Sequence, residues 1–257
     1  MAFMKIQHVY VILTCFPLLT SCINRGLNVT RPVPDRFVSV SDLDPTIQPD
    51  LRYYTANNFT GRQIKGYNSA KCILTIDAAK ALTTAQKQAN TFWYSIKVYD
   101  CYRPQRAVTD FVEWARDTGD TKMQHRFYPA VPKNELFKQG YIAEKSGHSR
   151  GSTLDLTLVP LQTRQPEANP ADNRYDCRLQ KSERYPDNSI DMGTGYDCFD
   201  ELAHTDNPLI IGTARKNRLL LRKIMESAGF VNYDKEWWHY TLRDEPFPDT
   251  YFDFPVQ

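Results

Sequence analysis

Apolar and polar residues alternate along residues 153–159 (TLDLTLV), which predicts a β-strand. The three leucines share one face and the polar residues, Asp155 among them, share the other, so we expect a half-buried strand. Residues 95–99 (SIKVY) show the same alternation over a shorter run. Near the C-terminus, residues 230–233 and 237–242 are expected to pair as a closing hairpin.

Three segments carry apolar residues at the spacing of an amphipathic helix. Residues 77–88 (DAAKALTTAQKQ) begin at Asp77, which is expected to cap the helix. Residues 104 to about 116 begin with a proline, which suits the first turn of a helix. Residues 214–228 form the third helix, with Gly229 as its natural C-terminal stop. The residues of this helix that we expect to face inward are Leu219, Leu220, Ile224 and Met225.

The segments between these elements show little periodicity. Residues 118–145 are expected to be irregular, and residues 160–208 are polar and rich in Pro, Asp and Asn, which is typical of a long loop. Strands and helices are mixed without a regular β-α-β order. We therefore predict an α+β fold, a single domain with a central antiparallel sheet flanked by helices.

The N-terminus has the pattern of an export signal rather than of a folded element. Lys5 precedes an almost wholly apolar run over residues 9–19, far shorter than the roughly 20 residues of a spanning helix. The run ends in Leu19-Thr20-Ser21-Cys22, which resembles the bacterial lipobox, in which the cysteine is acylated. We therefore favour a lipid anchor on Cys22 over an ordinary signal peptide that is cut elsewhere.

This reading divides the chain into a lipoprotein signal peptide (1–21), a proline-containing tether (22–40) and a folded domain (41–257). No later stretch is apolar enough to span a bilayer. We expect the protein to be exported and held by its lipid at a bacterial envelope membrane, where it faces the periplasm or the cell exterior.

Composition narrows the class of protein. Hydrophobic residues make up 41% of the 257 residues and charged residues 24%, values that are typical of a globular protein with a packed core. The formal net charge is only +2, so electrostatics give no reason to expect nucleic acid as a partner.

Export also changes how the cysteines are interpreted, because disulfides form in oxidising compartments. Four cysteines remain after the signal peptide and Cys22 are set aside, and they allow three pairings. We favour Cys72–Cys101 and Cys177–Cys198, each closing a loop of roughly a few tens of residues, over free buried thiols. Zinc bound by all four is disfavoured, because the sequence has no C-x-x-C pair.

Three clusters carry residues suited to metal-dependent chemistry. His148 precedes the predicted strand and Asp155 projects from its polar face, and imidazole nitrogens and carboxylate oxygens are both good zinc ligands. In the sequence EWWH, His239 can supply a third ligand, while Glu236 lies close enough to sit beside a metal without binding it. In the sequence YRP, Arg103 stands at a strand end next to a proline, a rigid mount for a cation.

Each of these residues alone has an ordinary explanation, such as a surface histidine, a solvated aspartate or a surface ion pair. Together they fit one chemistry: three metal ligands with a fourth position open to water, a spare carboxylate and a cationic helper. His125 and His204 lie in predicted loops without partnering motifs, so we expect neither to bind the metal.

The H-x6-D spacing, with E-x-W-H far downstream and Y-R-P upstream, resembles the zinc D-Ala-D-Ala peptidases, which share a fold with the Hedgehog N-terminal domain. Within that group the chain is similar to the VanX-type D-alanyl-D-alanine dipeptidases from about residue 40 to the end. The matching segments are NFTG, YRP, GHSRGS, DLTL and the C-terminal EWWHYTLRDEPFP…YFDFPV run. The dipeptidase of vancomycin-resistance clusters is cytoplasmic, without a lipobox or the Cys72 and Cys101 pair. Both departures agree with export and point away from antibiotic resistance.

The resemblance implies one zinc ion per chain, bound by His148, Asp155 and His239. General chemistry then assigns the remaining roles. Glu236 is expected to be the general base that takes a proton from the zinc-bound water, and to return it to the departing amine. Arg103 is expected to face the oxyanion that develops on the scissile carbonyl.

The same resemblance implies the substrate, D-Ala-D-Ala, and its contacts. Asp197 matches the family's acidic residue for the free ammonium, and a longer peptide would leave this carboxylate buried and unpaired. Further implied contacts are Ser146, Tyr53 and Tyr67, with Phe111 as a wall residue near the arginine; for both tyrosines, ordinary core packing is the alternative. The competing functions are a D,D-carboxypeptidase on peptidoglycan stem peptides and a non-catalytic lipoprotein that binds D-amino peptides.

Overall fold

The computed structural model describes residue 1 and residues 33–257. The apolar run and Cys22 lie outside the described residues. The main sheet has five strands in the order β2-β4-β5-β7-β6, and a second, two-stranded sheet pairs β1 with β3. The strands are β1 (Phe37–Ser39), β2 (Gln48–Pro49), β3 (Ile73–Thr75), β4 (Tyr94–Asp100), β5 (Thr153–Pro160), β6 (Phe230–Asn232) and β7 (His239–Leu242).

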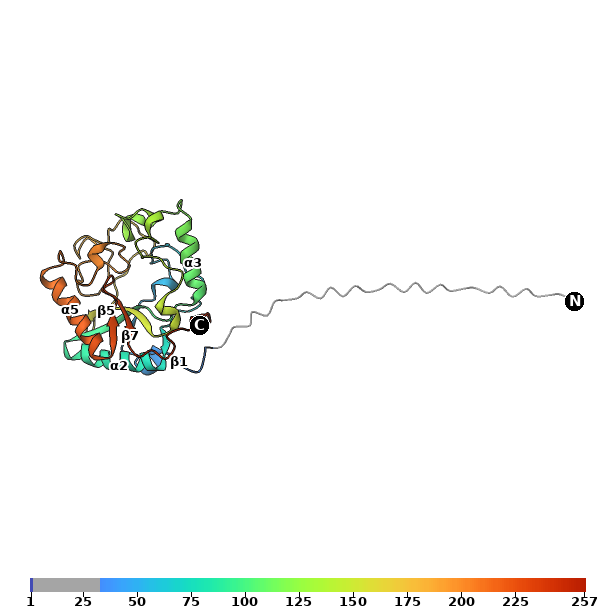
Figure 1. Ribbon diagram of the computed structural model, residues 1–257, viewed down its shortest axis with the longest axis horizontal. Helices are drawn as coiled ribbons and strands as arrows, with labels where there is room; N and C mark the ends of the chain where they lie inside the picture. Colours follow the sequence, from blue (N-terminus) through green and yellow to red (C-terminus); the bar gives the residue numbers. More distant parts are fainter. Residues whose placement is uncertain (2–32) are drawn as a thin grey trace.

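Two long helices, α2 (Ile76–Thr91) and α5 (Gly212–Ser227), contact each other and the main sheet. Figure 1 shows them towards one end of the molecule and α3 (Gln105–Arg116) towards the opposite end. The short helices are α1 (Val40–Leu43), α4 (Gln124–Phe127), η1 (Arg52–Tyr54), η2 (Lys133–Glu135), η3 (Gly147–Arg150) and η4 (Glu201–Ala203). The α+β class is therefore confirmed.

The main sheet is mixed, which corrects the expectation of a purely antiparallel one. The pairs β4–β5, β5–β7 and β6–β7 are antiparallel, but β2 runs parallel to β4 at one edge. The chain between β2 and β4 includes the whole of α2. A crossover of that length returns the chain in the same direction, as a parallel pair requires.

The central strand β5 is buried on both faces rather than half-buried, and every residue from Thr153 to Val159 is at most 2% exposed. Its leucines join a core with α2 and α5. Its polar face is also covered: Asp155 accepts a hydrogen bond from Tyr196 of the loop 160–208 and lies against Arg103. A second core, rich in aromatic side chains from α3 and the loops, lies in the same domain. Asp155 is therefore a buried carboxylate and not a solvated one.

Helix α2 begins at Ile76, and its cap is Thr75 rather than Asp77: the Thr75 side chain accepts a hydrogen bond from the Ala78 backbone N–H. Asp77 lies in the first turn, where its charge favours the helix dipole. In α5, Ile224 and Met225 face inward as expected, but Leu219 is 40% exposed and Leu221 is fully buried.

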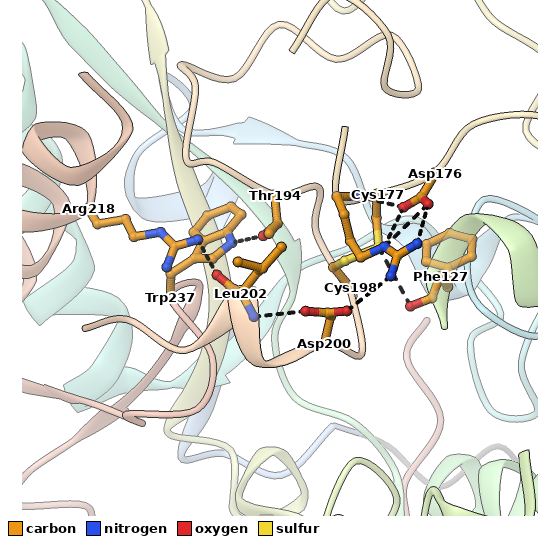
Figure 2. Close-up of a disulfide and its surroundings, with 10 residues drawn as sticks. Phe127, Asp176, Cys177, Thr194, Cys198, Asp200, Leu202, Arg218 and Trp237 are labelled. Carbon is orange, nitrogen blue, oxygen red and sulfur yellow. Dashed lines mark hydrogen bonds and ion pairs between the residues drawn. A yellow bond between two sulfur atoms is a disulfide. The ribbon is translucent and has the colours of Figure 1, made fainter. Parts of the chain in front are cut away.

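Arg218 accounts for this rotation of α5. It is buried on the inner face, one turn before Leu221 and two turns before Met225. Its guanidinium donates hydrogen bonds to the backbone carbonyls of Met192, Leu202 and His204. Figure 2 shows the bond to Leu202. Because this arginine satisfies three loop carbonyls by hydrogen bonds, it can lie in the core. The spacing of hydrophobic residues alone does not reveal such a position.

Some of the remaining expectations are confirmed and others need corrected bounds. Gly229 adopts the left-handed φ of 91° expected after α5, and β6 pairs with β7, although β7 begins at His239 rather than at residue 237. The folded part begins earlier than residue 41, because β1 lies within the expected tether and Phe37 packs against Tyr102. Among the described residues, no helix is long and apolar enough to cross a membrane.

Both favoured disulfides are present, Cys72–Cys101 and Cys177–Cys198. The second fastens the long segment 160–208, in which η4 is the one helical turn and no strand occurs after β5 ends. Figure 2 shows this disulfide beside Phe127, whose carbonyl accepts a hydrogen bond from the Phe199 backbone N–H. The loop is thus attached to α4 directly beside the bridge.

Candidate metal centre and active site

Adjacent strands of the main sheet bring acidic and imidazole side chains together. Asp100 at the end of β4 lies opposite Asp155 of β5, and Asp155 lies opposite His239 of β7. His148 comes from η3, directly before β5, where its backbone N–H donates to the Ser146 side chain. The residues between His148 and Asp155 therefore comprise the rest of one helical turn and the start of one strand.

Gly151 makes the passage from η3 into β5 possible. Its φ is 85°, a left-handed value that glycine adopts without cost. A Cβ atom at this position would lie 2.2 Å from the ring of Phe37. The turn that aims His148 at the strand therefore requires glycine.

Three ligand atoms form a nearly equilateral triangle. His148 Nε2 lies 3.3 Å from Asp155 Oδ1, His239 Nδ1 lies 3.1 Å from the same oxygen, and the two nitrogens are 3.3 Å apart. Zinc bonds of about 2.0–2.1 Å in tetrahedral geometry require ligand atoms about 3.3 Å apart. Asp155 Oδ1 is also buried without a hydrogen-bond partner among the described residues. The donor set therefore fits a divalent metal ion.

In two of these ligands, the polar atom that does not face the metal position forms a hydrogen bond within the protein. His148 Nδ1 lies 2.8 Å from the Cys101 carbonyl, which can only accept, so this nitrogen carries the proton and Nε2 presents its lone pair. Asp155 Oδ2 accepts a hydrogen bond of 2.9 Å from the Tyr196 hydroxyl. His148 and Asp155 are thus each oriented with one atom facing the metal position.

The pKa values show how strongly the site favours a positive charge between these ligands. The neighbouring His148 and His239 hold the pKa of the Asp155 carboxyl well below its usual range, against the effect of burial. Burial lowers the pKa of His239, but Asp155 and Glu236 outweigh it and raise that pKa to about 9. A metal cation would replace the protons that these groups compete for.

Glu236 and Arg103 flank the triangle. Glu236 Oε2 is 3.4 Å from His239 Nδ1, and the carboxylate is 20% exposed, so it lies beside the metal position on the open side. Arg103 Nε donates to Asp100 Oδ2 at 2.9 Å, and its Nη2 lies 3.6 Å from Asp155 Oδ2. The guanidinium also lies over the rings of Tyr53 and Phe111, 5.0 and 5.2 Å from their centroids.

These groups line one cavity of about 250 Å³. This volume is below the roughly 300–1,000 Å³ of ordinary small-molecule sites, so it suits a small ligand. Its polar and charged lining comprises Tyr53, Arg103, Tyr141, Lys145, Ser146, His148, Asp155, Asp197, Tyr233, Glu236 and His239. The cavity therefore joins the metal position to a separate acidic group, Asp197.

Asp197 is held in an unusual way. Its φ is 56°, a left-handed value that is uncommon for residues other than glycine. The residues on either side fix it, since Tyr196 is bonded to Asp155 and Cys198 belongs to a disulfide. Its side chain accepts a hydrogen bond of 2.9 Å from the Tyr53 hydroxyl. Burial, with the nearby charge of Asp155, raises the pKa of Asp197 well above its usual value.

A family model described as "D-ala-D-ala dipeptidase" matches the chain over residues 34–172 and 171–257. The D-alanyl-D-alanine dipeptidase of Streptomyces coelicolor is 39% identical over 220 residues, which is 86% of this chain and 98% of that protein. The protein of the same name from Enterococcus faecium is 37% identical over 221 residues, with the same coverage. The one from Escherichia coli is 31% identical over 205 residues, 80% of this chain and 83% of that protein.

The chain belongs to the D-Ala-D-Ala dipeptidase family. In this member of the family, the structure brings His148, Asp155 and His239 within 4.8 Å of one another, as the sequence motifs predicted. His125 is exposed and binds the Arg174 carbonyl, so it lies apart from the centre.

The predicted substrate contacts of this dipeptidase-family chain do not all reach the cavity. Tyr53, Phe111, Ser146 and Asp197 line it. Tyr67 is buried, and its hydroxyl instead donates to Asp100 Oδ1 at 2.6 Å. It is not among the residues that line the cavity.

The sequence analysis did not identify two residues that contact the proposed metal ligands. Asp100 holds Arg103 and lies 3.5 Å from His148 Nδ1, while Tyr196 binds Asp155. Asp100 had a signal, since it stands three residues before Arg103 at the end of a predicted strand. Tyr196 had none beyond its position next to Asp197, because a phenol in a long loop has many ordinary roles.

Proposed function

We propose that this protein hydrolyses the free dipeptide D-Ala-D-Ala to two D-alanines with a single zinc ion held by His148, Asp155 and His239. The observation that carries the proposal is the ligand triangle opening into the small cavity, in a chain of this family. Zinc in this site would lower the pKa of a bound water from about 15.7 toward 7.

Glu236 is the proton carrier in this scheme. It lies beside His239 but outside the group of three ligands, with part of its carboxylate open to the cavity. A carboxylate in that place accepts the proton of the attacking water and returns it to the departing amine. A protein that only bound its ligand would have no use for such a base.

Arg103 is the donor for the oxyanion that forms on the scissile carbonyl. Its Nε is engaged with Asp100, which fixes the plane of the guanidinium, and the group faces the cavity beside Asp155. Stacking on Tyr53 and Phe111 restricts it further. A positioned cation needs no reorganisation as negative charge develops.

Asp197 selects for dipeptides by binding the free ammonium. It is 4% exposed, so its charge has little access to water and needs a cationic partner in the cavity. The ammonium of D-Ala-D-Ala supplies that charge. An N-terminally extended stem peptide presents a neutral amide there, and the carboxylate would remain unpaired.

Metal dependence is tested by measuring zinc content and D-alanine release together. We expect one zinc per chain, loss of activity after chelation and recovery on adding zinc. His148→Ala and His239→Ala should lose zinc and activity, whereas His125→Ala, the control at an exposed histidine, should keep both. Full activity in metal-free protein would refute the proposed chemistry.

We also propose that the protein acts outside the cytoplasm, anchored to an envelope membrane through a lipid on Cys22. The lipobox-like sequence supports this, as do two disulfides, which suit an oxidising compartment. Cells supplied with labelled palmitate should label the protein, and Cys22→Ser should abolish the label. A label that survives the substitution would contradict the anchor.

A further inference from the structure

A second cavity lies behind the active site. It is bounded by β4, η1 and the loop 160–208, has a volume of about 40 Å³, and shares no lining residue with the metal cavity. Four cationic side chains line it: Arg52, Arg126, Lys181 and Arg184. One carboxylate, Asp187, lines it as well.

That carboxylate is already paired. Asp187 accepts from Lys97 Nζ and from Arg52 Nη2, each at 2.6 Å. Arg52 also pairs with Asp50 at 2.9 Å. The negative charge of Asp187 is thus engaged by Arg52 and by Lys97, which stands behind the cavity.

Two other cations lack such a partner. Among the described residues, neither Arg126 nor Lys181 forms an ion pair. Arg126 donates to the Asn57 side chain and to the carbonyls of Pro170 and Asp172, and Lys181 Nζ donates to the Asp187 carbonyl. Burial, with the nearby charge of Arg52, lowers the pKa of Arg126 to about 9. A buried cation without a counter-charge is costly.

Two buried donors in the cavity wall are also unsatisfied. Arg52 Nε and Arg184 Nη1 have no hydrogen-bond partner within residues 33–257, although both side chains are more than nine-tenths buried. Arg184 uses its other terminal nitrogen for Asp191. Such donors require a ligand or water. The volume holds a small ion with a water, since one water needs roughly 10–15 Å³.

We propose that this cavity binds a small inorganic anion, with chloride as the representative. Around it, five cations face three carboxylates, which leaves an excess of two positive charges. The cations are Arg52, Lys97, Arg126, Lys181 and Arg184, and the carboxylates are Asp50, Asp187 and Asp191. The volume excludes larger anions such as nucleotides.

The anion site contacts the active site through one tyrosine. Tyr196 lines the anion cavity, and its hydroxyl binds the proposed metal ligand Asp155. Its ring stacks on Tyr99 at 4.3 Å, and the Arg52 guanidinium lies over both rings. Asp197 is the next residue. An anion that fixes Arg52 therefore also fixes the backbone that carries Asp197, and this consequence rests on the proposed function.

Binding is tested first by thermal unfolding of the purified protein at constant ionic strength, as chloride replaces gluconate, which is too large for the cavity. We expect a saturable rise in Tm of about 5 °C when chloride reaches a hundredfold excess over its Kd. Equal Tm values in both salts would overturn the proposal.

Three variants locate the effect. Arg184→Met and Lys181→Met should abolish the chloride response, and Lys181→Met covers the case in which loss of the more buried arginine prevents folding. Arg174→Met is the matched control, because Arg174 lies in the same loop but pairs with Asp172 at the surface. A chloride response retained in both cavity variants would refute the assignment.

Direct observation comes from crystals grown in bromide. An anomalous peak is expected between the guanidinium groups that line the cavity. Water alone in the cavity, with bromide elsewhere on the surface, would overturn the proposal. If bromide occupies the cavity but chloride leaves the KM for D-Ala-D-Ala unchanged, the anion site stands and only its link to Asp197 is wrong.

Discussion

Replacing Asp197 by Asn should change substrate binding and protein stability in opposite directions. The change keeps the size of the side chain and its contact with Tyr53 but removes the buried carboxylate that would pair with the substrate ammonium. Losing one partner of a buried ion pair costs about 3–4 kcal/mol, at the lower end of measured values. Since 1.4 kcal/mol is tenfold, kcat/KM for D-Ala-D-Ala should fall about 10²–10³-fold.

The same substitution should stabilise the free protein at neutral pH. Burial raises the pKa of Asp197 above its unfolded value of about 3.9, so the folded state holds a proton that the unfolded state has released. The free energy of unfolding therefore falls as the pH rises from about 4 through the folded pKa. Asparagine does not titrate, so Asp197→Asn should be more stable than wild type at pH 7 and similar below pH 4.

The assay combines kcat/KM for D-Ala-D-Ala and for N-acetyl-D-Ala-D-Ala with denaturant unfolding at both pH values. The wild type should strongly prefer the free dipeptide, and the variant should lose most of that preference. Asp172→Asn, a change in the same loop at a carboxylate paired with Arg174, is the control. A variant that keeps wild-type kcat/KM, or that is less stable at pH 7, would refute the reasoning.

Glu236→Gln should lower kcat about 10²–10⁴-fold while zinc content stays at one per chain; unchanged kcat would exclude it as the base. Arg103→Met should lower kcat about 10²–10³-fold with a smaller change in KM, measured by steady-state kinetics. Tyr196→Phe should weaken zinc binding about 10–100-fold in a chelator competition, because Asp155 loses its hydrogen bond. Replacing Cys177 and Cys198 together by Ala opens a loop of 21-residue separation and should cost about 3 kcal/mol of stability in denaturant unfolding; a wild-type midpoint would contradict this.

The grouping of the proposed metal ligands was predictable because these residues lie in short motifs on regular elements. His148, Asp155 and His239 come from one turn and two neighbouring strands, and strand register alone brings the latter two side by side. Alternation identified β5, and the lipobox-like segment indicated an oxidising compartment in which four cysteines would pair. The parallel edge strand β2 was missed, because two residues carry no periodicity.

The features that sequence analysis missed depend on tertiary contacts. Arg218 is buried because three loop carbonyls surround it, and no local pattern records those carbonyls. Alternation placed Asp155 on the polar face of its strand but could not show that Tyr196 and Arg103 cover that face. Tyr196 and Asp100 become visible only when β4, β5 and the long loop are placed together.

The most direct test of the account measures D-alanine release by the zinc-loaded protein from free D-Ala-D-Ala and, in parallel, from a peptidoglycan stem pentapeptide that ends in D-Ala-D-Ala. We expect chelator-sensitive release from the dipeptide and little from the pentapeptide. Comparable release from both would contradict selection by Asp197 and indicate a D,D-carboxypeptidase. No release from the dipeptide by folded, zinc-loaded protein would contradict the proposed activity itself.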